Sequence, residues 1–313
     1  MKIRPRAGDA LWMAVGAAIL LLFGLLVLLF GKPPGPNPQL EFKAQRIDLV
    51  AQMQLDLVSA SEAEKSAVLA VTDSESQAFA DQARASTANV ERELRELVEL
   101  SNQGGTQAER DLIAEFSQRL VDFQHVDDEL LGLAVKNTNL KANALAFGPA
   151  AGAVDEMCAA LSRLVAANAD SADAKKLMSL AFGAETSALR IQTLLPVHIA
   201  EASDPRMDEM EAVMTKEDET IRSDLAGLRA LPKLNADADL AVATSRYDQF
   251  SAIKSQILVL SRENTNVRSL SISLTQKRKI MLDCNEVLSQ LEDAIGKEPI
   301  EGATYGGRRF QAR

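Results

Sequence analysis

Apolar residues recur every three or four positions through most of the chain after Pro38, which is the spacing of one face of an α-helix. The clearest stripe runs from Ile113 through Phe123 to Leu133, and a second stripe with the same spacing runs from Leu240 through Phe250 to Leu260. No segment shows the alternation of apolar and polar residues, flanked by turn pairs, that strands need. The pattern predicts an all-α fold with these stripes in its core.

Clusters of Gly, Pro, Asn and Asp interrupt the helical pattern and predict where helices end. They divide the chain into eight helices, most of them near 30 residues and therefore about 45 Å long. The predicted helices span residues 39–72, 74–102, 107–136, 139–168, 171–202, 205–231, 236–263 and 266–296.

The second half of the chain repeats the first. Residues 113–164 align with residues 240–291 without a gap, at an offset of 127, and the Asn-Thr-Asn sequence at 137–139 falls on the same sequence at 264–266. Further upstream, Ala60–Ala67 resembles Ala181–Ala188 at an offset of 121. Agreement at nearly one offset indicates a duplicated unit of four helices. We therefore expect one four-helix bundle at residues 39–168 and a second at residues 171–296.

Short connections force neighbouring helices to run antiparallel, so each unit is expected to fold up-down-up-down. The fourth helix would then return to the end where the first began, and the fifth would reverse near Asp170 or Ser171. This reasoning predicts two bundles packed side by side about a pseudo-twofold axis, with an Asn-Thr-Asn turn at the top of each.

The segment 10–30 has 21 residues and no charge, which is enough for a helix to cross a hydrocarbon core of about 30 Å. A membrane anchor is favoured over a cleaved signal peptide, whose apolar region is shorter, and over a buried helix. Basic residues precede it, so residues 1–9 are expected to form a cytoplasmic tail and the rest of the chain to be exported. Four prolines in residues 31–38 predict an extended spacer.

Composition narrows the choice of function. The 313 residues carry a formal net charge of −10, which argues against nucleic acid as a partner. Two Cys and two His leave little for a metal site, and nothing in the sequence calls for a cofactor. Residues 297–313 are expected to be a flexible tail, basic at its end, where Arg308, Arg309 and Arg313 would lie near anionic lipid headgroups.

Several features together resemble the four-helix-bundle sensor domain of methyl-accepting chemotaxis receptors. They are the helix around Ala63–Ala70, the segment Glu93–Leu97 before a Gly-Gly turn, the helix Phe123–Leu133 and a closing helix that reaches Leu164. The resemblance covers residues 39–296 as two copies. It implies a periplasmic sensor at the inner membrane of a bacterium. The sequence shows no second membrane span and no signalling coiled coil, so a separate receptor or kinase is expected to carry the signal.

The candidate chemistry is sparse. His125 and His198 lack the partners of a metal or catalytic site and are interpreted as surface or interface residues. Cys284 falls on an apolar stripe, and a disulfide with Cys158 stays open because side-by-side bundles would place both thiols at similar heights. The Asn-Thr-Asn segments are interpreted as helix ends, with the second Asn of each as an N-cap. No arrangement typical of an enzyme is present.

Arg119 and Arg246 are equivalent in the two copies and lie one helical turn before Phe123 and Phe250. They are interpreted either as snorkelling surface residues or, by the resemblance, as clamps for a small carboxylate ligand.

Two functions remain. The first is a membrane-tethered sensory module that binds a small solute or a soluble protein, and the second is a structural scaffold or spacer of the cell envelope.

Overall fold

The computed structural model describes residues 38–299, and every regular element within that range is a helix. The predicted all-α fold is therefore confirmed. The predictions for residues 1–37 and 300–313, which include the membrane anchor, most of the spacer and most of the basic tail, lie outside the described residues.

The first half of the described chain forms three long helices and a fourth, interrupted one. Asp73 and Ser74, a weak break in the sequence, begin the second long helix, which Thr72 caps by accepting a hydrogen bond from the backbone of Glu75. The elements are α2 (Pro38–Leu69), α3 (Asp73–Gly104), α4 (Gln107–Ala134), α5 (Thr138–Leu145), η1 (Ala146–Ala150) and α6 (Ala151–Ala167).

The second half repeats this order of elements. Three long helices are again followed by an interrupted fourth, and the π-helical turns η1 and η2 begin at positions that the 127-residue offset makes equivalent. The elements are α7 (Ala174–Ala200), α8 (Asp204–Arg229), α9 (Ala238–Glu263), α10 (Thr265–Ile272), η2 (Ser273–Lys277) and α11 (Arg278–Gly296).

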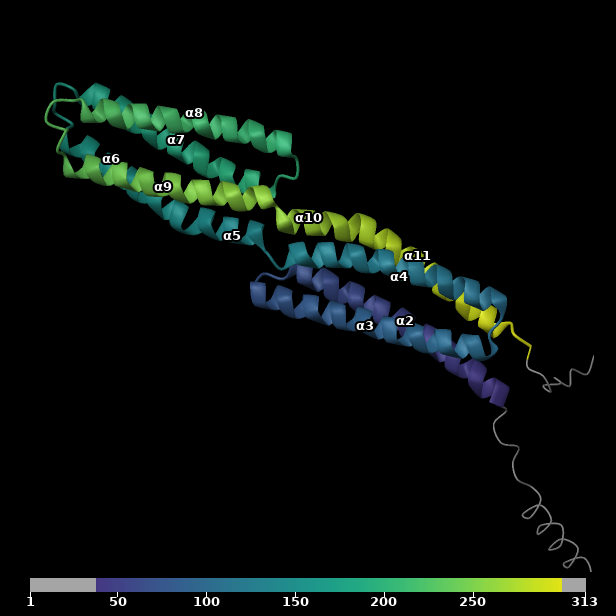
Figure 1. The fold of residues 1–313 in the computed structure, drawn as a ribbon. Helices are drawn as coiled ribbons and strands as arrows, with labels where there is room; N and C mark the ends of the chain where they lie inside the picture. Colours follow the sequence, from purple (N-terminus) through teal and green to yellow (C-terminus); the bar gives the residue numbers. More distant parts are fainter. Residues whose placement is uncertain (1–37, 300–313) are drawn as a thin grey trace, which may run out of the picture.

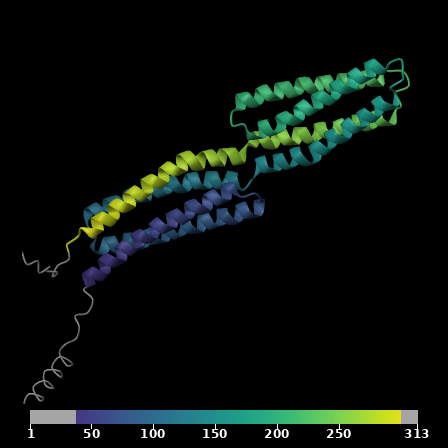
Figure 2. The ribbon, with the colours of Figure 1, turned by 180° about the vertical axis from the view of Figure 1, so that it is seen from behind.

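The two bundles are stacked end to end in one rod, so the predicted side-by-side arrangement is wrong (Figure 1). One bundle, which we call the proximal bundle because the described chain begins and ends at its far end, contains α2, α3, α4 and α10–α11. The other, the distal bundle, contains α5–α6, α7, α8 and α9. The view from behind shows the same order of elements along the rod (Figure 2).

The two halves have exchanged their fourth helices. Residues 139–168 leave the proximal bundle and pack against α7 and α9, while residues 266–296 return to pack against α2 and α4. The predicted units 39–168 and 171–296 therefore do not coincide with the two bundles. The expected reversal near Asp170 does occur, but at the distal tip of the rod rather than at its base (Figure 1).

The physical reason lies between α4 and α5. We expected the chain to fold back at the Asn-Thr-Asn segment, but only Asn137 leaves the right-handed helical region, with φ 51°. One residue in the left-handed conformation bends the chain without reversing it, and α5 continues away from α4 (Figure 1). Asn264 does the same between α9 and α10, with φ 52°.

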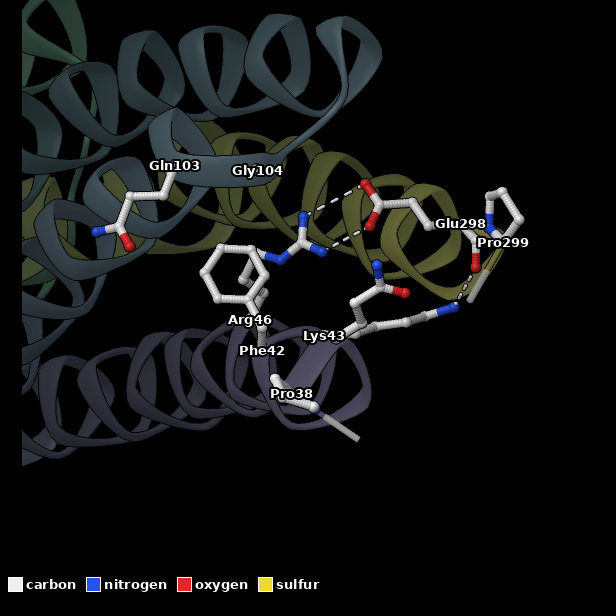
Figure 3. Close-up of a pocket in the computed structure, with 9 residues that line it drawn as sticks. Pro38, Phe42, Lys43, Arg46, Gln103, Gly104, Glu298 and Pro299 are labelled. Atoms are coloured by element: carbon white, nitrogen blue, oxygen red, sulfur yellow. Dashed lines mark hydrogen bonds and ion pairs between the residues drawn. The ribbon is translucent and has the colours of Figure 1, made fainter. Parts of the chain in front are cut away.

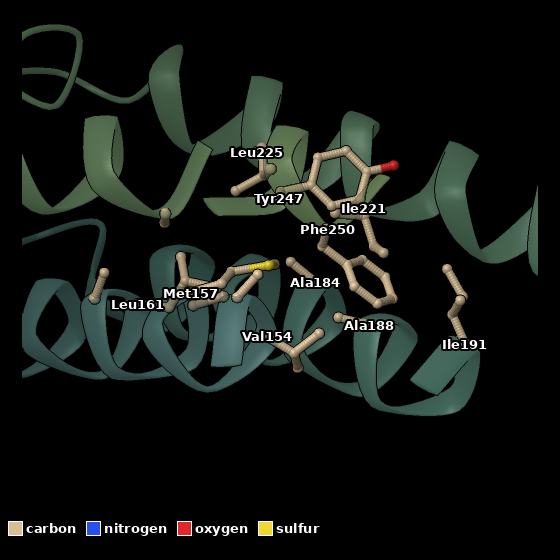
Figure 4. Packing of buried hydrophobic residues seen from close by; sticks show 14 of the residues in the cluster. Val154, Met157, Leu161, Ala184, Ala188, Ile191, Ile221, Leu225, Tyr247 and Phe250 are labelled. Atoms are coloured by element: carbon tan, nitrogen blue, oxygen red, sulfur yellow. The ribbon is translucent and has the colours of Figure 1, made fainter. Parts of the chain in front are cut away.

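Each bundle has an apolar core built from the predicted stripes. Phe123 in the proximal bundle and Phe250 in the distal bundle are fully buried. Around Phe250 the core is filled by small and medium side chains, among them Met157, Ala184 and Ala188 (Figure 4). Leu133 and Leu260, which the pattern also placed in the core, are only half-buried; on α4 the core positions next to Leu133 are Leu130, Leu131 and Ala134.

Within residues 38–299 one helical run is long and apolar enough to cross a membrane by length and composition alone. It is the run Gln107–Ala167, made of α4, α5, η1 and α6. Its apolar stripe packs into the cores of both bundles, so its length reflects its passage through the whole rod.

Candidate functional site

The joint between the bundles is a symmetric set of hydrogen bonds. The backbone N–H of Thr138 donates to the Thr265 hydroxyl at 3.2 Å, and the N–H of Thr265 donates to the Thr138 hydroxyl at 3.1 Å. The N–H groups of Asn139 and Asn266 donate to each other's side-chain oxygens, both at 3.1 Å. Each fourth helix thus has its first N–H groups satisfied by side chains of the other fourth helix.

The side-chain amides complete the joint. Asn139 donates to the Asn264 side chain at 2.7 Å, and Asn266 donates to the Asn137 side chain at 2.9 Å. All four side chains are at least partly buried. The prediction that Asn139 and Asn266 are N-caps of their own helices is therefore wrong, since both lie inside the first turn and cap the opposite helix.

Arg119 and Arg246, the predicted ligand clamps, lie in different bundles and are not brought together. Arg119 on α4 is 42% exposed and pairs with Glu115 one turn earlier, at 3.6 Å. Arg246 on α9 is 39% exposed and pairs with Glu156 of α6 at 2.7 Å. Neither borders the cavities described below. Each arginine is a surface residue that already faces a carboxylate.

Buried charged side chains lie instead in the half of the proximal bundle that is nearer the joint. Lys277 of η2 is 1% exposed, forms an ion pair with Asp127 of α4, and holds its ammonium 3.1 Å from the centre of the Phe123 ring. Glu64 of α2 has no exposed surface, and neither carboxylate oxygen has a hydrogen-bond partner among the described residues. A buried carboxyl group without hydrogen-bond partners costs folding free energy.

The environment of these groups changes their acidity. Burial raises the pKa of Glu64, although Ser273 and Lys277 nearby oppose the shift. Burial likewise raises the pKa of Asp127 against the attraction of Lys277, and it lowers the pKa of Lys277. In each case the low-dielectric interior disfavours the charged form.

The distal bundle carries a related pair with the charges reversed. Lys254, the repeat equivalent of Asp127, pairs with Asp218 of α8, which also accepts a hydrogen bond from the Tyr247 hydroxyl at 3.0 Å. Burial lowers the pKa of Lys254. Each bundle therefore has an ion pair at the same position of its third helix. That position is the carboxylate Asp127 in the proximal bundle and the ammonium Lys254 in the distal bundle.

A cavity of about 560 Å³ opens at the base of the proximal bundle, between the start of α2 and the segment after α11 (Figure 3). Arg46 is 2% exposed at its edge and forms ion pairs with Glu109 and, at 2.6 Å, with Glu298. Lys43 donates to the backbone oxygens of Gly296 and Glu298, at 2.6 and 2.9 Å. These contacts tie the two ends of the described chain together.

The two carboxylates around Arg46 respond differently. Burial raises the pKa of Glu109 more than the guanidinium lowers it. For Glu298 burial also acts upward, but the hydrogen bonds and charge of Arg46 hold its pKa below the usual range. The cluster of Arg46, Glu109 and Glu298 thus shifts the pKa values of its two carboxyl groups in opposite directions.

His198 is buried in the distal bundle rather than at a surface. Its Nδ1 lies 2.8 Å from the Ser261 hydroxyl and its Nε2 lies 2.9 Å from Glu211, which also accepts from Arg262 at 2.7 Å. The order Ser-His-Glu is that of a hydrolase triad, but the Ser261 hydroxyl is fully buried and also donates to the His198 carbonyl. The network joins α7, α8 and α9 and gives a substrate no access to the hydroxyl.

The remaining candidates are separate from these clusters. His125 is exposed on α4. Cys158 and Cys284 are free thiols in different bundles, so the disulfide left open by the sequence is not formed. Burial raises the pKa of Cys284 to about 12 and that of Cys158 to about 11, which makes both thiols poor nucleophiles at neutral pH. Within residues 38–299 no group of His, Cys, Asp or Glu is placed to hold a metal ion.

Sequence reasoning missed the buried charges because it treated charged positions on helices as solvated faces. A signal was present. Lys277 is in register with the apolar stripe that continues through Met281 and Cys284, and Glu64 and Arg46 are in register with the core positions of α2. A charged residue at a stripe position is directed toward the core, so these positions could have been singled out as candidate buried charges.

A family model for a four helix bundle sensory module for signal transduction matches residues 43–182. The resemblance to chemotaxis-receptor sensor domains is thus confirmed over this part of the chain. The matched residues run from α2 into α7 and are divided between the two bundles. The match spans one stretch, so it does not test the second copy.

Among solved structures, the chain is similar to a chain in the crystal structure of the TorS sensor domain–TorT complex in the presence of TMAO. The TM-score is 0.46 and the sequence identity 10%, over 83% of this chain and 100% of that chain. No curated protein sequence matches the chain.

Proposed function

We propose that the protein is an extracytoplasmic sensory module that binds a small solute or a soluble partner protein and passes this event to a separate membrane protein. The observation that carries the proposal is the match of residues 43–182 to a sensory four-helix bundle. We place it at a bacterial inner membrane, anchored by residues 10–30 with the N-terminus in the cytoplasm, because of the apolar run and the basic residues before it.

The geometry suits a relay along the rod. The helical runs α4–α5–α6 and α9–α10–α11 each pass through both bundles, so a shift in the distal bundle reaches the proximal bundle without crossing a flexible linker. At the base, Arg46 and Lys43 hold the start of α2 against the segment after α11. The base, next to the proposed anchor, is therefore the natural output end.

The alternative function, a rigid scaffold or spacer of the envelope, is favoured by the length of the rod and by its well-filled cores. A scaffold would hold its neighbour constantly, whereas a sensor would change its contact when a solute binds. The carboxylate clamp at Arg119 and Arg246 remains a prediction within the sensory proposal, since the resemblance alone suggested it.

Cross-linking in living cells distinguishes the two functions. A photo-reactive residue replaces exposed Ala44 near the base of the full-length protein, and a matched variant carries it at exposed Ser171 near the distal tip. We expect a membrane protein to be captured from Ala44 and not from Ser171, with a yield that changes when one solute of a test library is added. A yield that no solute changes would overturn the sensory proposal and favour the scaffold.

A further inference from the structure

A second cavity, of about 380 Å³, lies between α2 and the η2–α11 segment of the proximal bundle. Three cationic side chains border it: Lys65 from α2, Lys277 from η2 and Arg278 at the start of α11. No Asp or Glu is among its lining residues. The whole chain has a formal net charge of −10, so a cavity lined by three cations and no carboxylate differs in sign from the protein as a whole.

The two outer cations have no fixed role in the fold. Within residues 38–299 neither Lys65 nor Arg278 forms an ion pair, and both side chains are exposed. Lys277 differs, because Asp127 neutralises it within the bundle. The nearby Glu64 does not line the cavity, and burial raises the pKa of its carboxyl group. Lys65 and Arg278 are therefore the cations of the lining that no carboxylate holds in an ion pair among residues 38–299.

The rest of the lining is largely apolar. Leu274 and Leu282 line the cavity although 58% and 61% of their surface is exposed. Met281, which directly precedes Leu282, is half-buried. Leu274 lies seven and eight residues before Met281 and Leu282, about two helical turns away, and all three side chains border the cavity. Such a lining suits a ligand that has an apolar body as well as an anionic end.

Comparison of the two bundles shows that the architecture does not require these cations. The positions equivalent to Lys277 and Arg278 are Ala150 and Ala151, and the position equivalent to Lys65 is Thr186. The π-helical turn is present in both copies. The distal bundle thus folds around the same turn with small or neutral side chains, and the cationic cavity is a property of the proximal bundle alone among the described residues.

We propose that this cavity binds an organic monocarboxylate with a short apolar body, its carboxylate held between Lys65 and Arg278 and its body against Leu274, Met281 and Leu282. The proposal rests on the proposed sensory function and supplies a ligand class and a site for it. Ser61 and Ser273, which also line the cavity, add two hydroxyl groups to its lining.

Binding of benzoate to the full-length protein in mild detergent, measured by isothermal titration at pH 7, tests the proposal. The variant K65Q/R278Q removes both charges from exposed positions, and K279Q removes a neighbouring exposed charge that does not line the cavity. We expect benzoate to bind K65Q/R278Q at least about tenfold more weakly than wild type, which corresponds to about 1.4 kcal/mol, while K279Q binds like wild type.

Two further ligands separate charge from apolar contact. Acetate, which lacks the body, and benzyl alcohol, which lacks the charge, are both expected to bind more weakly than benzoate. Circular dichroism of each variant shows whether the fold is retained. Equal affinity of wild type and K65Q/R278Q for benzoate, or no binding to wild type at millimolar benzoate, would overturn the proposed site. If another solute still changes the cross-link from Ala44, the sensory function stands without this site; if none does, both proposals fail.

Discussion

Phe123 and Phe250 occupy equivalent positions in the two copies, and both are fully buried, but their surroundings differ in one respect. The Lys277 ammonium lies 3.1 Å from the centre of the Phe123 ring, whereas among the described residues no cation lies over the Phe250 ring. Replacing each by Leu keeps an apolar side chain but removes the ring. The pair therefore measures the contribution of a buried cation–π contact in one fold.

The expected magnitudes follow from these contacts. Truncation of either phenylalanine to Ala should cost about 3–5 kcal/mol, because a large cavity is left. Replacement by Leu should cost about 1–2 kcal/mol at Phe250, where only shape is lost. At Phe123 the loss of a desolvated cation–π contact adds about 2 kcal/mol. F123L should therefore be clearly less stable than F250L.

Urea unfolding of the full-length protein in mild detergent, followed by circular dichroism, gives the free energies. Because two helical runs pass through both bundles, we expect one cooperative transition, so that the two variants can be compared on one scale. If F123L were no less stable than F250L, the close contact between Lys277 and Phe123 would contribute nothing, and the reasoning about the buried cluster would be refuted.

Three further predictions concern other parts of the rod. Burial raises the pKa of Glu93 to about 7. Between about pH 4.5 and 7 the folded protein therefore binds one proton more than the unfolded chain does. The free energy of unfolding should fall as pH rises through this window, by up to about 1.4 kcal/mol per pH unit. In E93Q this loss should be absent, as urea midpoints across the window will show. T138V and T265V should each cost about 1–2 kcal/mol, and the double variant less than their sum, because the two hydroxyls serve one joint; additive costs would contradict the reciprocal contact. R119A and R246A should each change stability by less than about 1 kcal/mol, because exposed pairs contribute little; a large fall in melting temperature would show that they are structural.

Much of the fold was predictable because it depends on local patterns. The stripes through Phe123 and Phe250 fixed the helices and their buried faces, and the offset of 127 identified the repeat. These features are properties of single helices, so they can be read without knowledge of how helices are paired.

The exchange of fourth helices was not predictable in the same way. A bundle closed by its own fourth helix and a bundle closed by the other copy's bury the same stripes, because the copies are related. The choice is made at Asn137 and Asn264, where one left-handed residue continues the chain, and by the hydrogen bonds between Thr138 and Thr265. Those contacts join residues 127 positions apart in the sequence, and no local sequence pattern predicts them.

For the candidate sites the sequence pointed to different residues from those that border the cavity at η2. Arg119 and Arg246 drew attention because they are repeated, yet each faces a carboxylate at the surface. The cations that border the cavity at η2, such as Arg278, are those that the two copies do not share.

The stacking of the two bundles through exchanged helices underlies the proposed relay, and one distance tests it. Fluorescent labels are placed at exposed Asn102, in the last turn of α3 at the base, and at exposed Ala172, after α6 at the distal tip, with both native cysteines replaced. The helical run Gln107–Ala167 between them has 61 residues, so single-molecule energy transfer should report a separation of about 90 Å. Side-by-side bundles would bring both labels to the same end, within about 30 Å, the width of a few packed helices. High transfer efficiency would therefore contradict the stacked rod.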